Sequence, residues 1–294
     1  MSERHPIIAI TGSSGASTSS VTSTFESIFR REDVKAAAIE GDGFHRYDRK
    51  EMRARQAAAE MAGNTHFSHF GPENNLFPEL EQLFSSYSQS GTGQRRKYLH
   101  EAAQAAPHQQ EPGTFTPWEP IPEGTDMLFY EGLHGGVITP ELNIARHPDL
   151  LIGVVPVINL EWIQKLYRDK NVRGYSTEAV TDTILRRMPD YVNYICPQFN
   201  HTHVNFQRVP VVDTSNPFIA RDIPSADESI CVIRFAKPKG IDFPYLLSMI
   251  NDAWMSRANT VVVPGGKMEL AMQLIFTPFI WRMMERRKRA RAVL

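Results

Sequence analysis

A run of small polar residues near the start of the chain could bind phosphate through its backbone. Residues 12–20 lie between an apolar segment and a helical pattern. In such a loop, successive N–H groups turn toward an anion and the helix N-terminus adds partial positive charge. Gly12 and Ser19 fit the first glycine and the Mg²⁺-binding hydroxyl of the pattern G-x-x-x-x-G-K-[ST]. Ser17 and Thr18 replace its second glycine and its lysine. A serine-rich helix start is therefore the alternative, since Ser and Thr also cap helices. The candidate phosphate-binding residues are Gly12, Ser13, Ser14, Gly15, Ala16, Ser17, Thr18, Ser19 and Ser20.

Acidic residues that follow two later apolar segments support the phosphate-loop interpretation. Asp42 comes shortly after the predicted strand 34–39, and Glu131 ends the predicted strand 126–131. The carboxyl ends of parallel strands meet at one edge of a sheet, where ligands bind. An acid at the end of a second core strand usually accompanies a phosphate loop, because it holds Mg²⁺ or its waters. A ligand that carries phosphate groups is therefore expected together with Mg²⁺, with Ser19 and Glu131 as the metal-binding residues.

Two predicted helices between residues 160 and 190 carry a second group of charged side chains. Lys165, Asp169 and Arg173 recur at intervals of four residues, and Arg168 is beside them. This spacing is typical of a salt-bridged, solvent-exposed helix face. Two cationic helices around a loop are also typical of a lid that closes over the phosphates of a nucleotide. We expect the lid, whose second helix ends with Arg186 and Arg187.

The composition is that of an ordinary globular protein and excludes several function classes. The chain has 294 residues, 41% of them apolar, and a net charge of −1. Such a balance gives no general attraction to nucleic acid or to an anionic membrane. No apolar segment is long enough to span a bilayer, and we expect neither of these partners. Two cysteines without a C-x-x-C pair fit a reducing, cytoplasmic location.

The order of predicted elements indicates a single α/β domain. Strands alternate with helices in the first half, which predicts a parallel sheet, and the strand-rich region 191–235 predicts an antiparallel extension. Residues 88–122 are rich in Gly, Gln, Pro and Ser and are expected to form an insertion or hairpin. The expected strands are 6–11, 34–39, 126–131, 150–158, 191–196, 205–212, 229–235 and 261–264. The expected helices start near residue 21 and then cover 50–61, 77–87, 160–170, 177–188, 245–254 and 267–289.

Longer sequence stretches are more specific than the phosphate loop. They include Phe-Arg-Arg-Glu at 29–32, Ile-Glu-Gly-Asp at 39–42, Phe-His-Arg at 44–46, Phe-Ser-His-Phe at 67–70, Phe-Tyr-Glu-Gly-Leu-His-Gly at 129–135, and long runs at 152–165, 206–221 and 240–246. With these stretches almost the whole chain resembles the phosphoribulokinases, in particular their shorter bacterial class. The resemblance implies a P-loop NTPase fold like that of nucleoside and adenylate kinases, with a mostly parallel mixed sheet flanked by helices. It also implies transfer of the γ-phosphoryl group of MgATP to the 1-hydroxyl of ribulose 5-phosphate in the Calvin cycle.

The resemblance assigns roles to individual residues. Asp42 matches the catalytic base of that family, and Asp169 matches a second essential acid. Lys165 and Arg168 match lid cations, and Lys165 supplies the positive charge that Thr18 cannot. Arginine suits phosphate binding because its planar fork bonds phosphate bidentately. The expected substrate-binding residues are His45, Arg49, Arg173, Arg186 and Arg187.

The resemblance also implies a homo-octamer that is activated by NADH and inhibited by AMP. The positions associated with effector binding are Arg31, Tyr98, His100, Arg234 and Arg257. One departure affects the phosphate loop: if that backbone position needs positive φ, Ser17 strains it by about 1 kcal/mol or more. We therefore expect the KM for ATP to be higher than that of a Ser17→Gly variant. Two alternatives remain open, namely a uridine-kinase-like small-molecule kinase and a non-catalytic homologue that binds nucleotide or effector.

Overall fold

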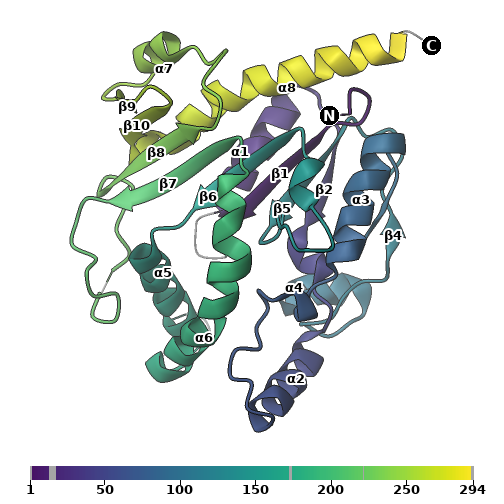
Figure 1. Cartoon of the computed structure of the whole chain (residues 1–294), viewed down its shortest axis with the longest axis vertical. Coiled ribbons are helices and arrows are strands. Elements are labelled where there is room, and N and C mark those ends of the chain that lie inside the picture. Colours follow the sequence, from purple (N-terminus) through teal and green to yellow (C-terminus); the bar gives the residue numbers. More distant parts are fainter. Residues whose placement is uncertain (1, 13–17, 172–173, 221, 293–294) are drawn as a thin grey trace.

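A mixed β-sheet forms the centre of the protein in the computed structural model, which describes residues 2–12, 18–171, 174–220 and 222–292. Its strands are β1 (Ile7–Gly12), β2 (Ala36–Glu40), β5 (Met127–Gly132), β6 (Leu150–Val155), β7 (Val204–Pro210), β8 (Ser229–Phe235), β9 (Trp254–Arg257) and β10 (Thr260–Pro264). In the described ranges the strand order is β2-β5-β1-β6-β7-β8-β10-β9 (Figure 1). Strands β2, β5, β1, β6 and β7 are parallel, and β8, β10 and β9 add antiparallel pairs. The predicted mostly parallel sheet with an antiparallel extension is confirmed.

Helices cover both faces of the sheet. The helices are α1 (Thr18–Arg31), α2 (Arg49–Met61), α3 (Phe77–Ser90), α4 (Ala102–Ala105), α5 (Ile158–Asn171), α6 (Thr177–Asp190), α7 (Phe243–Met249) and α8 (Met268–Ala292). Successive strand residues point to opposite faces, so Ile8 and Ile10 of β1 pack with α1 and α8. Ile7 and Ala9 pack with α3 on the other face. The described helices include none that is long and apolar enough to cross a membrane.

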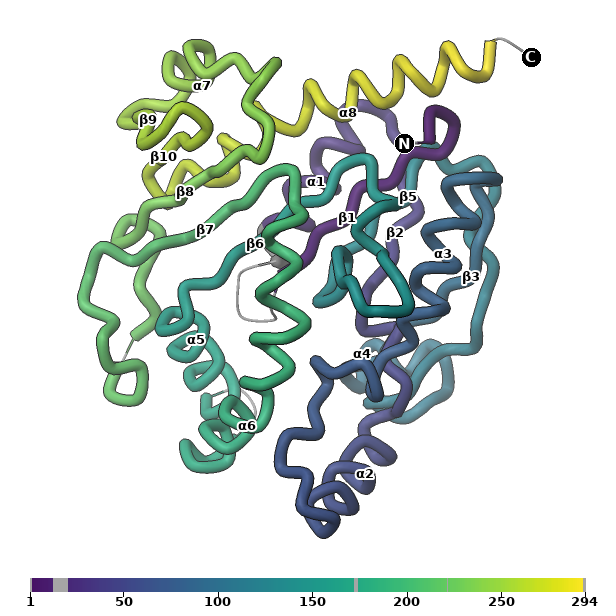
Figure 2. The backbone as a smooth tube through the Cα atoms, viewed as in Figure 1, coloured from purple at the N-terminus to yellow at the C-terminus, as the bar shows by residue number. Residues whose placement is uncertain are grey.

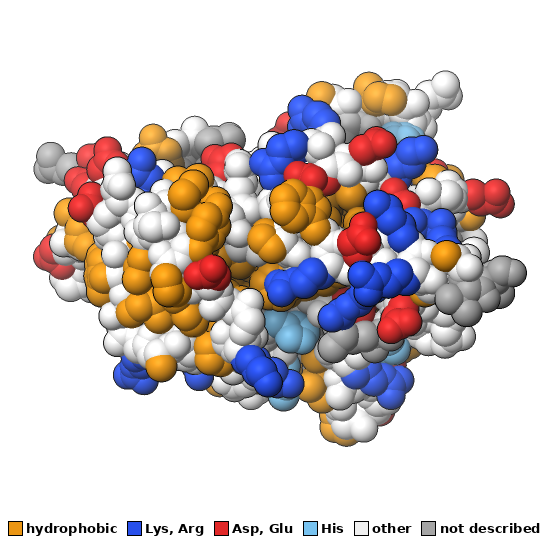
Figure 3. Space-filling view, turned by 90° about the horizontal axis from the view of Figure 1, so that it is seen from above, with side chains coloured by type: hydrophobic (Ala, Val, Ile, Leu, Met, Phe, Trp, Pro, Cys, Tyr) orange, Lys and Arg blue, Asp and Glu red, His pale blue; other side chains and the backbone are white. Residues whose placement is uncertain are grey.

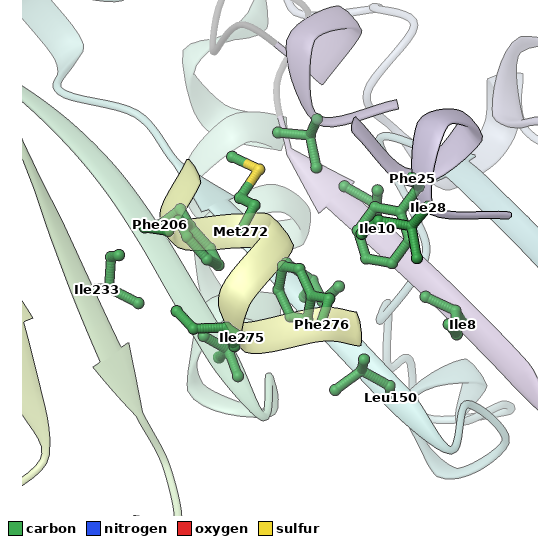
Figure 4. Packing of buried hydrophobic residues seen from close by; sticks show 14 of the residues in the cluster. Ile8, Ile10, Phe25, Ile28, Leu150, Phe206, Ile233, Met272, Ile275 and Phe276 are labelled. Atoms are coloured by element: carbon green, nitrogen blue, oxygen red, sulfur yellow. The ribbon is translucent and has the colours of Figure 1, made fainter. Parts of the chain in front are cut away.

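The larger core cluster joins α1, α8 and one face of the sheet. Phe25 of α1 stacks at 5.1 Å on Phe129 and at 4.9 Å on Phe276 of α8, measured between ring centroids. Figure 4 shows these elements converging on Ile10 and Ile28. Each fully buried side chain of this size contributes about 1.5–3 kcal/mol. The predicted apolar face of the first helix is confirmed, and it fixes α1 against the strand that precedes it.

Two predicted elements differ in the structure. Residues 191–196, expected as a strand, continue from α6 as a π-helical turn, Tyr191–Ile195, followed by the 3₁₀ turn Cys196–Asn200. Tyr191 and Ile195 are buried four residues apart, so this short apolar run fits a helical turn as well as a strand. The helix expected over 245–254 ends at Met249, because Asp252 adopts φ 63° and reverses the chain into β9.

The insertion at 88–122 forms a small antiparallel arm beside the main sheet. Strand β3 (Gln94–Arg95) pairs with β4 (Glu119–Pro120). Farther along the arm, the amide of Leu99 donates to the carbonyl of Thr114, and the bridge between Tyr98 and Phe115 continues the pairing. The two strands pair antiparallel, as in a hairpin. Figure 2 shows α2, α5 and α6 projecting at the opposite end of the protein from the C-terminal part of α8.

Candidate active site

The carboxyl ends of the parallel strands bring the sequence-predicted residues to one edge of the sheet. Glu131 of β5 lies beside Ile10 of β1 and beside Glu40 of β2. Residues 13–17 of the predicted phosphate loop lie outside the described residues. Thr18 to Ser20 begin α1, and their side chains are likewise outside the description. Strand β1 thus ends at Gly12 and helix α1 begins at Thr18, on either side of the predicted phosphate loop, and Glu131 lies on the neighbouring strand.

Asp42 lies in a 3₁₀ turn, Gly41–Phe44, that directly follows β2. Its carboxylate is held by two histidines: Oδ1 lies 3.2 Å from His45 Nε2, and Oδ2 lies 3.1 Å from His100 Nε2. The Asp42 side chain is still 37% exposed. A substrate hydroxyl can therefore reach a carboxylate whose orientation is already fixed.

Glycines allow the turn to pack tightly against its surroundings. A Cβ on Gly43 would lie 2.2 Å from the carbonyl oxygen of Arg96, and a Cβ on Gly41 would lie 2.5 Å from the Tyr130 hydroxyl. The Arg96 guanidinium donates to the carbonyls of Gly43 at 2.7 Å and His45 at 2.6 Å. The same guanidinium lies over the rings of Phe115 at 3.8 Å and Trp118 at 4.7 Å. The insertion arm thus holds the C-terminal end of the turn that carries Asp42.

The charges around Asp42 shift the titration of the groups it contacts. Burial opposes ionisation of Asp42, but the charge of His45 and the hydrogen bonds from His100 and His45 outweigh it, so the pKa of the Asp42 carboxyl lies well below its usual range. Burial opposes protonation of His45, yet attraction to Asp42 raises the pKa of His45 above its ordinary value. Burial and the charges of His45 and Arg187 lower the pKa of the neighbouring His69 to about 3. At neutral pH the site therefore holds an ionised Asp42 and a neutral His69, and Asp42 favours the protonated form of His45.

A second charged cluster lies on α5. Lys165 Nζ donates to Asp169 Oδ2 at 2.5 Å, and Arg168 Nε donates to Asp169 Oδ1 at 3.1 Å. The Lys165 and Asp169 side chains are only 11% and 6% exposed, which excludes the solvent-exposed face that their spacing also allowed. Burial and the charge of Arg187 lower the pKa of Lys165 to about 8, although the bond to Asp169 raises it. Burial raises the pKa of Asp169, but the bonds from Lys165 and Arg168 outweigh it and keep that pKa below the ordinary value.

The predicted substrate-binding cations occupy several positions. Arg49 begins α2 and donates to the carbonyl of His100 at 2.8 Å, so it belongs to the Asp42 cluster. Arg187 lies over the ring of Phe70 at 5.1 Å and lines a pocket with Lys165. Arg186 instead forms an ion pair with Glu60 of α2. Arg173 lies outside the described residues.

The five candidate effector residues do not form one cluster. Tyr98 and His100 contact each other, with ring centroids 4.7 Å apart, and both lie at the Asp42 site. Arg31 ends α1 and donates to Thr277 Oγ1 of α8 at 2.7 Å. Arg234 of β8 and Arg257 of β9 both lie opposite Thr260 of β10. Two of the five therefore belong to the candidate active site by position.

Two site residues have no recognisable signal in the sequence. Asn75 accepts a hydrogen bond from His45 Nδ1 through its Oδ1 atom at 3.0 Å, and Arg96 holds the Asp42 turn as described. An isolated asparagine in a loop and an arginine in a polar insertion are ordinary surface residues by pattern. Only the folded structure shows their function, because it pairs the backbone of 74–76 with that of 44–46 and brings the side chains of Arg96 and His100 to the 41–46 segment.

Comparisons with known proteins agree with this arrangement. Residues 7–215 match the model of the phosphoribulokinase / uridine kinase family. The chain is 76% identical over 290 residues to the plasmid phosphoribulokinase of Cupriavidus necator, covering 99% of each chain. It is 67% identical over 290 residues to the phosphoribulokinase of Nitrobacter vulgaris, covering 99% of this chain and 100% of the relative. The solved structure of phosphoribulokinase from Rhodobacter spheroides superposes with a TM-score of 0.90 at 58% identity, covering 98% of this chain and 100% of that one.

Proposed function

Because the chain belongs to the phosphoribulokinase family, we propose that the cluster around Asp42 carries out its reaction, the ATP-dependent phosphorylation of ribulose 5-phosphate at the 1-hydroxyl. The products are ribulose 1,5-bisphosphate and ADP, which places the enzyme in the Calvin cycle. The observation that supports the assignment is the ionised, partly exposed Asp42 carboxylate at the carboxyl edge of the sheet, fixed by His45 and His100. Strand β1, after which the nucleotide site is predicted, ends at the same edge.

Asp42 acts as the general base for the attacking hydroxyl. Phosphoryl transfer passes through a loose transition state with little bonding to the attacking oxygen. The base therefore needs to remove the hydroxyl proton only late, as the new O–P bond forms. A carboxylate of low pKa suffices for such a late transfer, provided that it is correctly oriented. His45 and His100 supply that orientation through one carboxylate oxygen each.

Cations near Asp42 are assigned to two anionic groups, the phosphate of the sugar and the phosphoryl group that is transferred. His45 and Arg49 belong to the Asp42 cluster and are assigned to the phosphate of the sugar, together with Arg173. Lys165 and Arg168, held by Asp169 on α5, are assigned to the transferred phosphoryl group, whose charge they neutralise. Arg187, which shares a pocket with Lys165, adds positive charge to the same region. We assign His100 and Tyr98 to the substrate site rather than to effector binding, because they contact Asp42 and His45.

Magnesium fits the donor set at this edge. Glu131 offers a hard carboxylate oxygen on the strand beside β1, and Ser19 offers the hydroxyl that the phosphate-loop pattern assigns to the ion. When bound with ATP, Mg²⁺ neutralises charge on the phosphates. Thr18 stands where the phosphate-loop pattern has a lysine and carries no charge, so Lys165 supplies part of the missing positive charge. ATP itself is assigned to residues 12–20.

Assembly and regulation follow the bacterial class in our proposal, as a cytoplasmic homo-octamer activated by NADH and inhibited by AMP. Tyr245, Met249 and Trp254 of α7 and β9 are each nearly half exposed. Figure 3 shows hydrophobic side chains gathered on the left of the molecule, the side on which Figure 1 draws α7 and β9. Exposed apolar groups next to an edge strand favour contact with another subunit. Arg234 and Arg257 lie on this same antiparallel extension, where an anionic effector could bind between subunits.

ADP release measured with MgATP and either ribulose 5-phosphate or uridine tests the proposal. We expect turnover with ribulose 5-phosphate only, and ribulose 1,5-bisphosphate as the product. Turnover with uridine alone would favour a uridine-kinase-like enzyme, and turnover with neither in a folded sample would favour a non-catalytic homologue. NADH should raise the rate and AMP should lower it, and light scattering should give the mass of an octamer.

A further inference from the structure

The orientation of the Asn75 side chain is determined by its surroundings. Asn75 is 2% exposed, and its Nδ2 atom donates to the carbonyls of His69 at 2.8 Å and Gly71 at 2.7 Å. Both partners only accept hydrogen bonds, so Nδ2 must face them. The Oδ1 atom consequently faces His45 Nδ1 at 3.0 Å. Reversing the amide would place its oxygen against two carbonyl oxygens.

This orientation fixes both nitrogens of His45. A side-chain carbonyl oxygen only accepts, so Nδ1 of His45 must carry a proton. The other ring nitrogen, Nε2, lies 3.2 Å from Oδ1 of Asp42, and an ionised carboxylate also only accepts. Nε2 therefore carries a proton as well. The His45 ring, held between Asn75 and Asp42, is an imidazolium.

The backbone makes this contact rigid. The amide of Leu76 donates to the carbonyl of Phe44 at 2.8 Å, and the amide of Arg46 donates to the carbonyl of Asn74 at 2.8 Å. The segments around His45 and Asn75 thus pair directly, as an antiparallel bridge. Asn75 cannot move away without breaking this pairing.

We propose that Asn75 is a positioning residue for phosphoryl transfer, whose side-chain oxygen keeps His45 doubly protonated, so that His45 orients Asp42 through Nε2 and attracts the sugar phosphate through its positive charge. The proposal rests on the assignment of His45 to the substrate. Asp42 and His100 contact this cluster from one side, and His69 stacks on His45 with centroids 5.2 Å apart. Other titratable groups that act on His45 or its neighbours include Tyr98 from the insertion arm, Arg187 from α6, Lys165 from α5 and the buried His134 after β5. Burial and Arg187 oppose the charge of His45, whereas Asp42 and Asn75 favour it.

Asn75→Leu tests the proposal, because leucine keeps the volume and removes the acceptor. The dissociation constant of ribulose 5-phosphate is measured calorimetrically without nucleotide, which keeps the chemical step out of the readout, over a pH series that rises from the ordinary pKa of histidine, about 6.5. We expect wild-type affinity to fall as pH rises and His45 loses its proton. In Asn75→Leu the same fall should begin about one pH unit lower, and the two curves should converge at the acidic end. The KM for ATP should not change.

Two further variants separate positioning from a general structural role. Asn74 is an equally buried neighbour whose Nδ2 donates to the carbonyl of Ser68 and does not touch His45, so Asn74→Leu should leave the pH curve in place. Asn75→Asp retains an acceptor oxygen and should keep the curve at or above its wild-type position. In a His45→Gln background, Asn75→Leu should cause less than a twofold further loss of affinity.

An unchanged pH curve in Asn75→Leu, or equal losses in the presence and absence of His45, would overturn the role of Asn75. Should Asn75→Leu fail to fold, a curve for Asn75→Asp that falls about one unit below wild type would overturn it instead. Absence of ribulose 5-phosphate binding and turnover in the wild-type protein would refute the proposed function itself, which is a separate outcome.

Discussion

Replacement of Gly43 by alanine should slow catalysis without weakening ATP binding. The added methyl group would collide with the insertion arm, which packs against the turn that carries Asp42. The new Cβ would lie 2.2 Å from the carbonyl oxygen of Arg96, whereas real Cβ contacts are essentially never under 3.0 Å. The turn and the insertion arm must therefore separate by about 0.8 Å, the difference between these distances. Both sides of the contact are backbone, so no flexible side chain can absorb the change.

The separation moves the catalytic base itself. Asp42 precedes Gly43 in the turn, and the hydrogen bonds from the Arg96 guanidinium to Gly43 and His45 would lengthen together. A misplacement near 1 Å of a reacting group costs about 10²-fold in rate. We expect kcat to fall about 30- to 100-fold. Overpacking should also lower the free energy of unfolding by about 1–3 kcal/mol.

Initial rates of ADP release at saturating ribulose 5-phosphate, with the KM for ATP and the thermal midpoint, measure these effects. Gly266→Ala is the matched control, because a Cβ there makes only an ordinary contact of 3.4 Å with Asp227. Its kcat should equal that of the wild type. A Gly43→Ala enzyme within about threefold of wild-type kcat would refute the reasoning, since a shift of this size should cost more.

Three other substitutions test separate parts of the structure. Lys165 is charged below its pKa of about 8 and neutral above it, so kcat should fall as pH rises through that value; Lys165→Arg should abolish this fall, and its persistence would exclude Lys165 as the cause. Arg287 of α8 is 7% exposed and pairs with Asp126 at 2.7 Å, so Arg287→Met should lower the free energy of unfolding by about 2–4 kcal/mol in denaturant titration, whereas exposed Lys288→Met should leave it unchanged. Ser17→Gly should lower the KM for ATP, and equal KM values in the pair would show that Ser17 causes no strain.

Local patterns predicted most of the sheet and the helices that cover it. The apolar residues of the first strand and the spacing of Val21, Phe25 and Ile28 on the first helix are confirmed as core positions. The edge at which parallel strands end follows from topology, so the sequence could place Asp42 and Glu131 near one another. The segment 191–196 could not be assigned, because two buried residues at a spacing of four fit either element.

Contacts between segments that are distant in sequence were not predictable from local patterns. His100 and Arg96 reach the Asp42 turn from an insertion more than 50 residues away in the chain. Burial of the Lys165–Asp169 pair depends on α6 and the turn after it, since the same spacing is common on exposed helices. Lysine and aspartate are usually exposed residue types, so the burial of Lys165 and Asp169 could not be predicted from the residue types alone.

The most direct test of the proposed mechanism is the kinetics of Asp42→Asn, which keeps the size of the side chain and removes the base. We expect kcat to fall by about 10³-fold or more, while the dissociation constant of MgATP stays within twofold of the wild-type value. A decrease in kcat of less than about tenfold would contradict the mechanism and would assign the role of the base to Asp169.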